Sequence, residues 1–109
     1  MPVKHIVLVK FTEETEDTAI VALSKAFGAL QSSIPGISVF ESGRNISPEG
    51  LGHGFTHAFV MTFVDVAARD GYLPHAQHQA FVERLKPCLA DVLVVDYLLP
   101  ASQIVPPAS

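Results

Sequence analysis

Apolar residues are spaced along this chain in two ways, and the spacing predicts the secondary structure. Strand-like apolar runs occupy residues 3–11, 37–44, 55–63 and 92–99. Apolar residues three or four positions apart recur over residues 19–30 and predict an amphipathic helix that follows an acidic, threonine-rich start. Shorter helical segments are expected at residues 64–70 and 75–89, with Pro74 between them. The predicted order is therefore strand, helix, strand, strand, helix, strand.

This order favours an α+β fold with one four-stranded antiparallel sheet and the helices on one of its faces. The first, third and last strands are apolar on both faces, and the last strand carries Leu93, Val95 and Tyr97 on one side and Val94 and Leu98 on the other. We expect the third and last strands to be buried on both faces and most protected from amide exchange. A bare apolar sheet face promotes association, so the pattern predicts a symmetric homodimer.

Composition limits the partners of the chain. Its 109 residues suit one domain, which we place at residues 1–100, followed by a flexible tail at residues 101–109. Lys and Arg number 7 against 11 Asp and Glu, and no basic block occurs, so nucleic acid is not expected as a partner. No apolar run reaches the roughly 20 residues that span a bilayer, so no membrane partner is expected either.

Cysteine content and the first residues indicate a compartment. Cys88 is the single cysteine, which fits a reducing cytoplasm, and the first residues lack the features of a signal peptide. Cys88 itself is interpreted as a small buried hydrophobe rather than as a reactive thiol. We therefore expect a cytoplasmic protein.

A phenol and two imidazoles, Tyr72, His75 and His78, fall within seven positions after a strand-like run. Such side chains donate, accept and transfer protons near neutral pH. His5 and His57 lie on strands, each on the face that carries further apolar residues. Each of these residues also has a purely structural interpretation: a core histidine, a packing aromatic with its hydroxyl at the surface, or, for His75, a helix cap.

Metal and ion-pair interpretations are weaker. His75 and His78 have a spacing that suits metal ligands on a helix, but no cysteine accompanies them, and further ligands would have to come from His5 or His57. We therefore expect no metal. Arg69 and Asp70 are interpreted as a surface ion pair or structural tie without a catalytic role.

The whole pattern resembles a known family. The runs at residues 3–11, 56–63, 69–78 and 91–97 together resemble the stress-responsive A/B barrel (Dabb) domain. That resemblance implies a ferredoxin-like βαββαβ protomer, a dimeric α+β barrel and no organic cofactor. One plant branch of the family contains a polyketide cyclase that acts by aldol condensation, and in that enzyme a tyrosine and a histidine act in the pocket.

Tyr72 and His78 match that tyrosine and histidine in place. The resemblance implies that His78 takes a proton next to a carbonyl while Tyr72 holds the developing enolate. The expected pocket-lining residues are His5, Val7, Val9, Phe27, His57, Phe59 and His75. Ser24 and Gly28 are small where helix residues wall the plant pocket, so the substrate does not carry over.

Two classes of function follow. One is a small-molecule site, either a cyclase-like or lyase-like acid/base enzyme or a binder of a small hydrophobic or aromatic ligand. The other is a non-catalytic stress protein in which the histidines and the tyrosine are structural. The observation that separates them is whether one cavity contains both Tyr72 and His78.

Overall fold

The computed structural model describes residues 1–100 and 105–108 and has the predicted order of elements. The strands are β1 (Val3–Phe11), β2 (Ile37–Arg44), β3 (His57–Phe63) and β4 (Leu89–Leu98). The helices are α1 (Asp17–Ser33), α2 (Val66–Tyr72) and α3 (Ala76–Leu85), and a 3₁₀ turn, Lys86–Cys88, joins α3 to β4. Most of the predicted tail at residues 101–109 lies outside the described residues.

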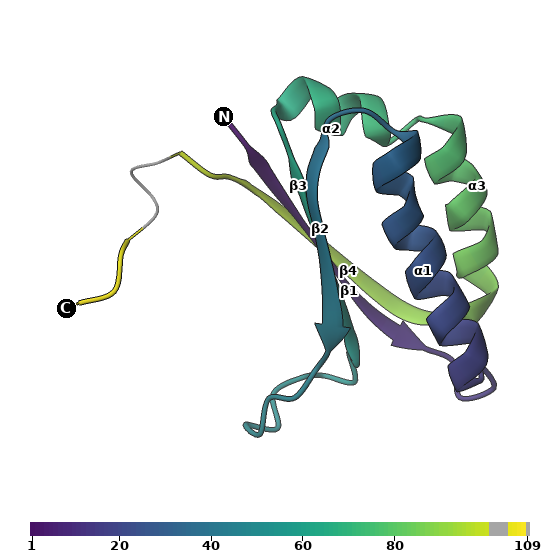
Figure 1. The fold of residues 1–109 in the computed structure, drawn as a ribbon. Coiled ribbons are helices and arrows are strands. Elements are labelled where there is room, and N and C mark those ends of the chain that lie inside the picture. The colour runs from purple at the N-terminus through teal and green to yellow at the C-terminus, as the bar shows by residue number, and fades with distance from the viewer. Residues whose placement is uncertain (101–104, 109) are drawn as a thin grey trace.

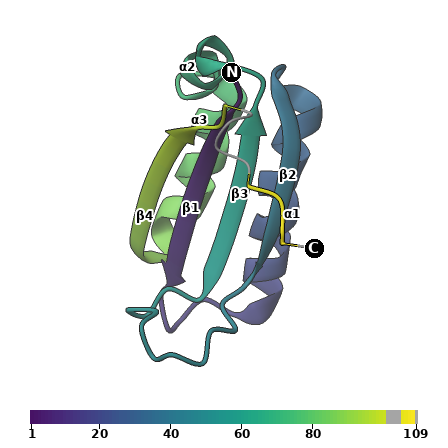
Figure 2. The same ribbon diagram turned by 90° about the vertical axis from the view of Figure 1, so that its left-hand side faces the viewer.

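The four strands form one antiparallel sheet in the order β2-β3-β1-β4. Both long helices pack on the same face of this sheet (Figure 1). The opposite face carries no helix and is turned to the viewer in Figure 2. The molecule is thus a two-layer ferredoxin-like α+β protomer, as the sequence pattern predicts.

The core lies between the helices and the two central strands. Alternate residues of β1 point to the helices and are buried, which is the period expected of a strand with one covered face. Opposite them, α1 contributes one apolar stripe. The buried core residues that β1, β3 and α1 contribute are Val3, Val7, Val9, Phe59, Met61, Phe63, Leu23, Phe27 and Leu30. The small residue Gly28 admits the ring of Phe40, whose atoms approach within 3.2 Å of a Cβ built there.

The prediction for the last strand is wrong within the single chain. The register places β4 at the edge of the sheet, paired only with β1, and most of its residues are exposed. Leu93, Val95 and Tyr97 lie on the open face and are about half exposed. The strands that are flanked on both sides are β1 and β3, so we expect these two to carry the most protected amides.

Element boundaries shift where side chains cap the helices. Helix α2 starts at Val66 because the Asp65 carboxylate accepts a hydrogen bond from the Ala68 amide at 2.8 Å. Strand β3 starts at His57, two residues later than predicted, since the Phe55 amide donates to the Gly52 carbonyl instead. The intervening loop at residues 45–56 extends from one end of the sheet beyond its open face (Figure 1).

Candidate functional site

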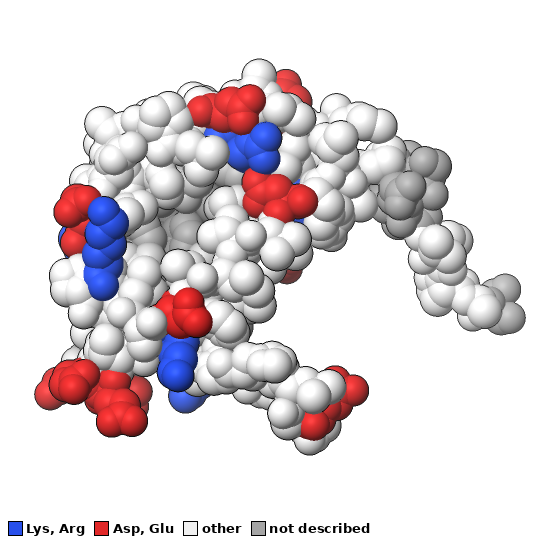
Figure 3. Space-filling model, turned by 180° about the vertical axis from the view of Figure 1, so that it is seen from behind, with Lys and Arg blue, Asp and Glu red and all other residues white. Residues whose placement is uncertain are grey.

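A cavity of about 220 Å³ lies between α3 and the β1–β4 half of the sheet. Seen from behind, the surface is hollowed among uncharged residues, with charged groups around the hollow (Figure 3). Its walls are mainly apolar, with three polar side chains at one end. The lining residues are His5, Val7, Phe27, Tyr72, Leu73, His78, Phe81, Val82, Leu85, Leu89, Val92 and Val94. A mostly apolar cavity with a few convergent polar groups is the usual form of a ligand site.

Tyr72 is the last residue of α2 and is fully buried beneath the sheet. Its ring packs against Phe63 at 5.0 Å and against His5 at 5.8 Å between centroids. Among the described residues, its hydroxyl has no hydrogen-bond partner. Burial raises the pKa of this phenol far above its ordinary value. Tyr72 is therefore a hydrogen-bond donor at neutral pH, and its donor is unused by the fold.

His78 lies in the first turn of α3, with its ring 4.2 Å from that of Tyr72 between centroids. Its Nδ1 lies 2.9 Å from the carbonyl oxygen of Leu73. A carbonyl only accepts, so Nδ1 carries the proton and Nε2 keeps its lone pair in the neutral ring. Burial lowers the pKa of His78, against a smaller raising effect of the Leu73 hydrogen bond. His78 is thus neutral at pH 7 and can act as a base through Nε2.

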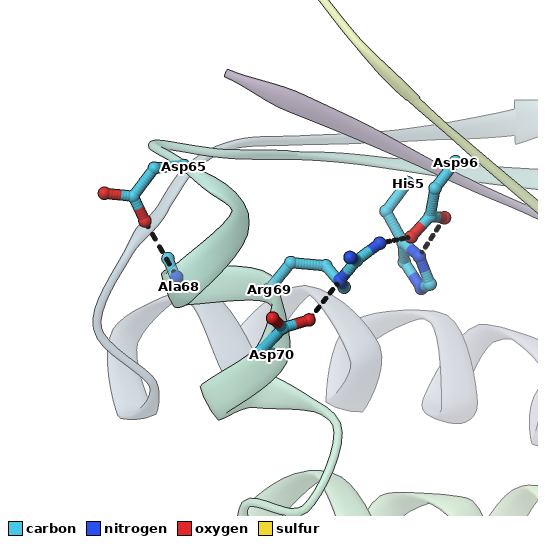
Figure 4. Close-up of polar contacts among 6 residues, drawn as sticks. All are labelled: His5, Asp65, Ala68, Arg69, Asp70 and Asp96. Atoms are coloured by element: carbon cyan, nitrogen blue, oxygen red, sulfur yellow. Dashed lines mark hydrogen bonds and ion pairs between the residues drawn. The ribbon is translucent and has the colours of Figure 1, made fainter. Parts of the chain in front are cut away.

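His5 belongs to a chain of hydrogen-bonded polar side chains that links β1, β4 and α2 (Figure 4). Its Nδ1 lies 2.6 Å from Oδ1 of Asp96, the residue opposite it in the sheet. The other carboxylate oxygen, Oδ2, accepts a hydrogen bond from Nη1 of Arg69 at 2.7 Å. Arg69 also donates from Nε to Asp70 at 2.8 Å. The carboxylate of Asp96 orients the His5 ring at the cavity wall.

Four of the expected pocket-lining residues lie elsewhere. Val9 is fully buried in the core, and His75 caps α3 by accepting a hydrogen bond from the Gln77 amide at 3.1 Å. His57 and Phe59 line a separate groove between α1 and β2. This follows from the strand order, because β3 lies on the side of β1 away from β4. The structure therefore brings together His5, Val7, Phe27, Tyr72 and His78, and not the other members of the set.

A sequence model of the Stress responsive A/B Barrel Domain (Dabb) matches residues 3–99 of this chain. The chain belongs to the Dabb family. Among curated proteins, this Dabb chain is 34% identical over 96 residues to stress-response A/B barrel domain-containing protein HS1 of Arabidopsis thaliana, covering 88% of each chain. It is 26% identical over 97 residues to olivetolic acid cyclase of Cannabis sativa, covering 89% of this chain and 96% of the cyclase.

Solved structures show the same fold. A hydroxynitrile lyase from Passiflora edulis superposes with a TM-score of 0.87 at 24% identity, covering 96% of the Dabb chain and 97% of the lyase. At that identity the likeness concerns the fold alone. A dimeric ferredoxin-like protein of unknown function from Jannaschia superposes with a TM-score of 0.80 at 26% identity, covering 91% of the Dabb chain and all of that protein.

Sequence reasoning about this Dabb chain missed the part played by Asp96 and Arg69. Asp96 lies 91 positions from His5 along the chain, and only the pairing of β1 with β4 brings the two together. An acidic residue inside an otherwise apolar strand was the available signal. Arg69 does form the expected ion pair with Asp70, but it also reaches Asp96.

Metal clusters and membrane-spanning helices are both absent from the part of the chain that the structure describes. There, no group of three or more His, Cys, Asp or Glu side chains is placed to hold a metal ion. No described helix combines the length and apolarity needed to cross a membrane. Cys88 is half-buried and packs against the core.

Proposed function

We propose that the cavity binds a small carbonyl compound with an apolar body and catalyses proton transfer at the carbon next to the carbonyl. One observation carries the proposal: a buried hydroxyl without a partner among the described residues, on Tyr72, lies beside the neutral imidazole of His78. Burying a hydroxyl without a hydrogen bond is costly, so a fold that keeps one is expected to use it for a ligand.

The two side chains differ in the proton that each holds. Nε2 of His78 takes the proton from the α-carbon, and the enolate oxygen that forms accepts a hydrogen bond from the Tyr72 hydroxyl. In a cyclase-like reaction the enolate carbon then attacks a second carbonyl of the same molecule. A carbon–carbon bond forms, the second carbonyl oxygen becomes an alkoxide, and that oxygen takes the proton from His78. No electrons leave the system, so no redox cofactor is required.

The walls of the cavity define the class of ligand. Phe27, Phe81 and Leu85 approach from the helices, and Val7 and Val94 from the sheet. Because the volume lies below the roughly 300–1,000 Å³ of typical ligand pockets, we expect a small ligand, or one whose tail leaves through the mouth. Resemblance to olivetolic acid cyclase supports a polyketide-like carbonyl compound.

We also propose that the protein is a homodimer formed through the open sheet face. Leu93, Val95 and Tyr97 of β4 are 46–51% exposed there, and Leu8 and Ile6 of β1 lie beside Leu93 and Val95 on the same face. Covering them removes apolar area from water, which is the main driving force of association. We place the protein in the cytoplasm, because a single cysteine fits a reducing compartment. We take residues 1–100 as one domain, because their buried residues form one core.

A non-catalytic stress protein is the second candidate. The observation that favours it is the chain of hydrogen bonds from His5 through Asp96 to Arg69, which ties three elements together and gives His5 a structural role. Similarity to the stress-response A/B barrel protein HS1 supports the same candidate.

The test is exchange of α-protons. A panel of small ketones and β-diketones is incubated with the protein in D₂O, and loss of the α-proton signal is followed by NMR. We expect His78→Ala to slow exchange by about 10²–10⁴-fold, the usual contribution of a general base. His53→Asn is the matched control, because His53 is an exposed loop histidine with φ 51°, which Asn tolerates. Equal exchange rates in wild type, His78→Ala and Tyr72→Phe would favour the stress protein.

A further inference from the structure

Arg69 lies at the centre of a series of hydrogen-bonded polar side chains that runs from the protein surface to the cavity. On its outer side, Nε donates to Asp70, whose side chain is 61% exposed. On its inner side, Nη1 donates to Asp96, whose side chain is 20% exposed, and Asp96 in turn contacts His5, whose side chain is 6% exposed. The series thus passes from solvent to a buried imidazole at the cavity wall (Figure 4).

One carboxylate here serves two groups that can carry positive charge. A buried histidine 2.6 Å from a carboxylate is normally held as an imidazolium, since the ion pair stabilises the proton. In this protein the second oxygen of Asp96 is already taken by a guanidinium, which keeps its charge at any physiological pH. Hydrogen bonds to Asp96, and then to Asp70, raise the pKa of Arg69 further. The negative charge of Asp96 is therefore balanced before His5 gains a proton.

Among the described residues, the other groups that face His5 supply no negative charge. Tyr72 of α2 packs edge-on against it and stays neutral, as does Phe63 of β3. His78 of α3 lies nearby and carries no negative charge, and His5 is one of the groups that lower the pKa of His78. Asp96 of β4 is the one carboxylate in direct contact with His5 among the described residues. Compensation of that carboxylate by Arg69 thus decides the state of the ring.

We propose that Arg69 is a positioning residue that, by holding and neutralising Asp96, keeps His5 neutral with Nδ1 protonated and Nε2 free at the cavity wall. His5 then offers the ligand a hydrogen-bond acceptor from the side of the sheet, next to the Tyr72 donor, whose ring centroid lies 5.8 Å from that of His5. This inference rests on the proposed function for its meaning, because an acceptor there matters only if a ligand enters. Its physical content, the protonation state of His5, is measurable without any ligand.

The experiment uses the full chain with ¹⁵N-labelled histidine, and NMR reports the protonation of each ring nitrogen of His5 at pH 7. In wild type we expect Nδ1 to be protonated and Nε2 to be unprotonated. In Arg69→Gln, which keeps a hydrogen-bond donor but loses the charge, we expect the ratio of protonated to neutral His5 to rise roughly tenfold. Arg69→Lys, which keeps the charge, should restore the wild-type ratio if charge is the cause.

Two further variants make the result specific. Asp70→Asn removes the exposed partner of Arg69 and should leave the His5 signals unchanged, because that carboxylate is screened by solvent. Asp96→Asn removes the carboxylate and should abolish the response of His5 to Arg69→Gln. An Arg69→Gln protein with wild-type His5 signals would overturn the inference. If instead the expected His5 response appears while no ketone exchanges its α-protons, the proposed function fails and this inference holds.

Discussion

Replacement of Tyr72 by phenylalanine is expected to stabilise the protein while it weakens ligand binding. The Tyr72 side chain is fully buried, and its hydroxyl has no hydrogen-bond partner among the described residues. Burying such a group costs roughly 1–3 kcal/mol relative to a satisfied one. Phenylalanine keeps the ring contacts with Phe63 and His5 and loses only the oxygen, so a small void offsets part of the gain.

We therefore expect Tyr72→Phe to raise the free energy of unfolding by about 1 kcal/mol. For a domain of this size that corresponds to a rise in Tm of about 4–8 °C. The assay is urea and thermal unfolding followed by circular dichroism, with wild type and variant at equal protein concentration, since dimerisation adds a concentration-dependent term. Ligand affinity should fall about tenfold in the same variant, the effect of one lost hydrogen bond.

Tyr97 supplies the matched control because it is the only other tyrosine and its ring lies on the open sheet face. Tyr97→Phe should leave ligand affinity unchanged. A loss of 1 kcal/mol or more of stability in Tyr72→Phe would refute the reasoning. It would mean that the hydroxyl has a structural partner and that the fold, not a ligand, requires it.

Three other predictions concern assembly, pH and the backbone. Val95→Glu on the open face should convert a particle of twice the 11.7 kDa chain mass into a monomer by light scattering. Val21→Glu should not, because Val21 is as exposed as Val95 but lies on α1, which covers the opposite face of the sheet. An intact dimer in both variants would contradict the interface. Because the pKa of His78 is lowered, the rate of α-proton exchange should rise with pH with a midpoint below pH 6.5. The free energy of unfolding should fall as the pH drops below 6.5, because the unfolded chain takes up that proton first. A midpoint above pH 6.5 would refute the lowered pKa on which both expectations rest. Gly36→Ala should lower the free energy of unfolding in urea by about 1–3 kcal/mol, because φ is 93° there and the new Cβ would lie 2.5 Å from a side-chain atom of α2. Gly43→Ala should lower it little, because nothing lies within 4 Å of the new Cβ. Equal effects would contradict the strain at Gly36.

The sequence predicted the strands and helices better than it predicted which of them lie side by side. Residues 3–11 and 37–44 form strands with the predicted limits, because a period of two and β-branched residues are local signals. The edge position of β4 was not predicted, since strand order depends on how the helices cross over the sheet. The same limit applies to His57, which points to the helix side as expected but lies on the far side of β1 from the cavity.

The candidate site was predictable where a resemblance supplied it. Tyr72 and His78 were chosen because they match the family, and the fold places them together through the turn at Pro74 between α2 and α3. The contact between Arg69 and Asp96 spans 27 positions and two kinds of element, so no spacing rule points to it. Nor could the sequence show that the Tyr72 hydroxyl is buried, because a tyrosine in a packed domain commonly has its ring in the core and its hydroxyl at the surface.

The most direct test of the proposed site is the carbonyl stretch of a bound, ¹³C-labelled small ketone, measured by infrared difference spectroscopy. If the Tyr72 hydroxyl donates to the carbonyl oxygen, binding to wild type lowers the stretching frequency, and binding to Tyr72→Phe at saturating ligand leaves it near the value in an apolar solvent. The same lowered frequency in both proteins, or no change on binding to wild type, would contradict the central claim that this buried hydroxyl recognises a carbonyl group.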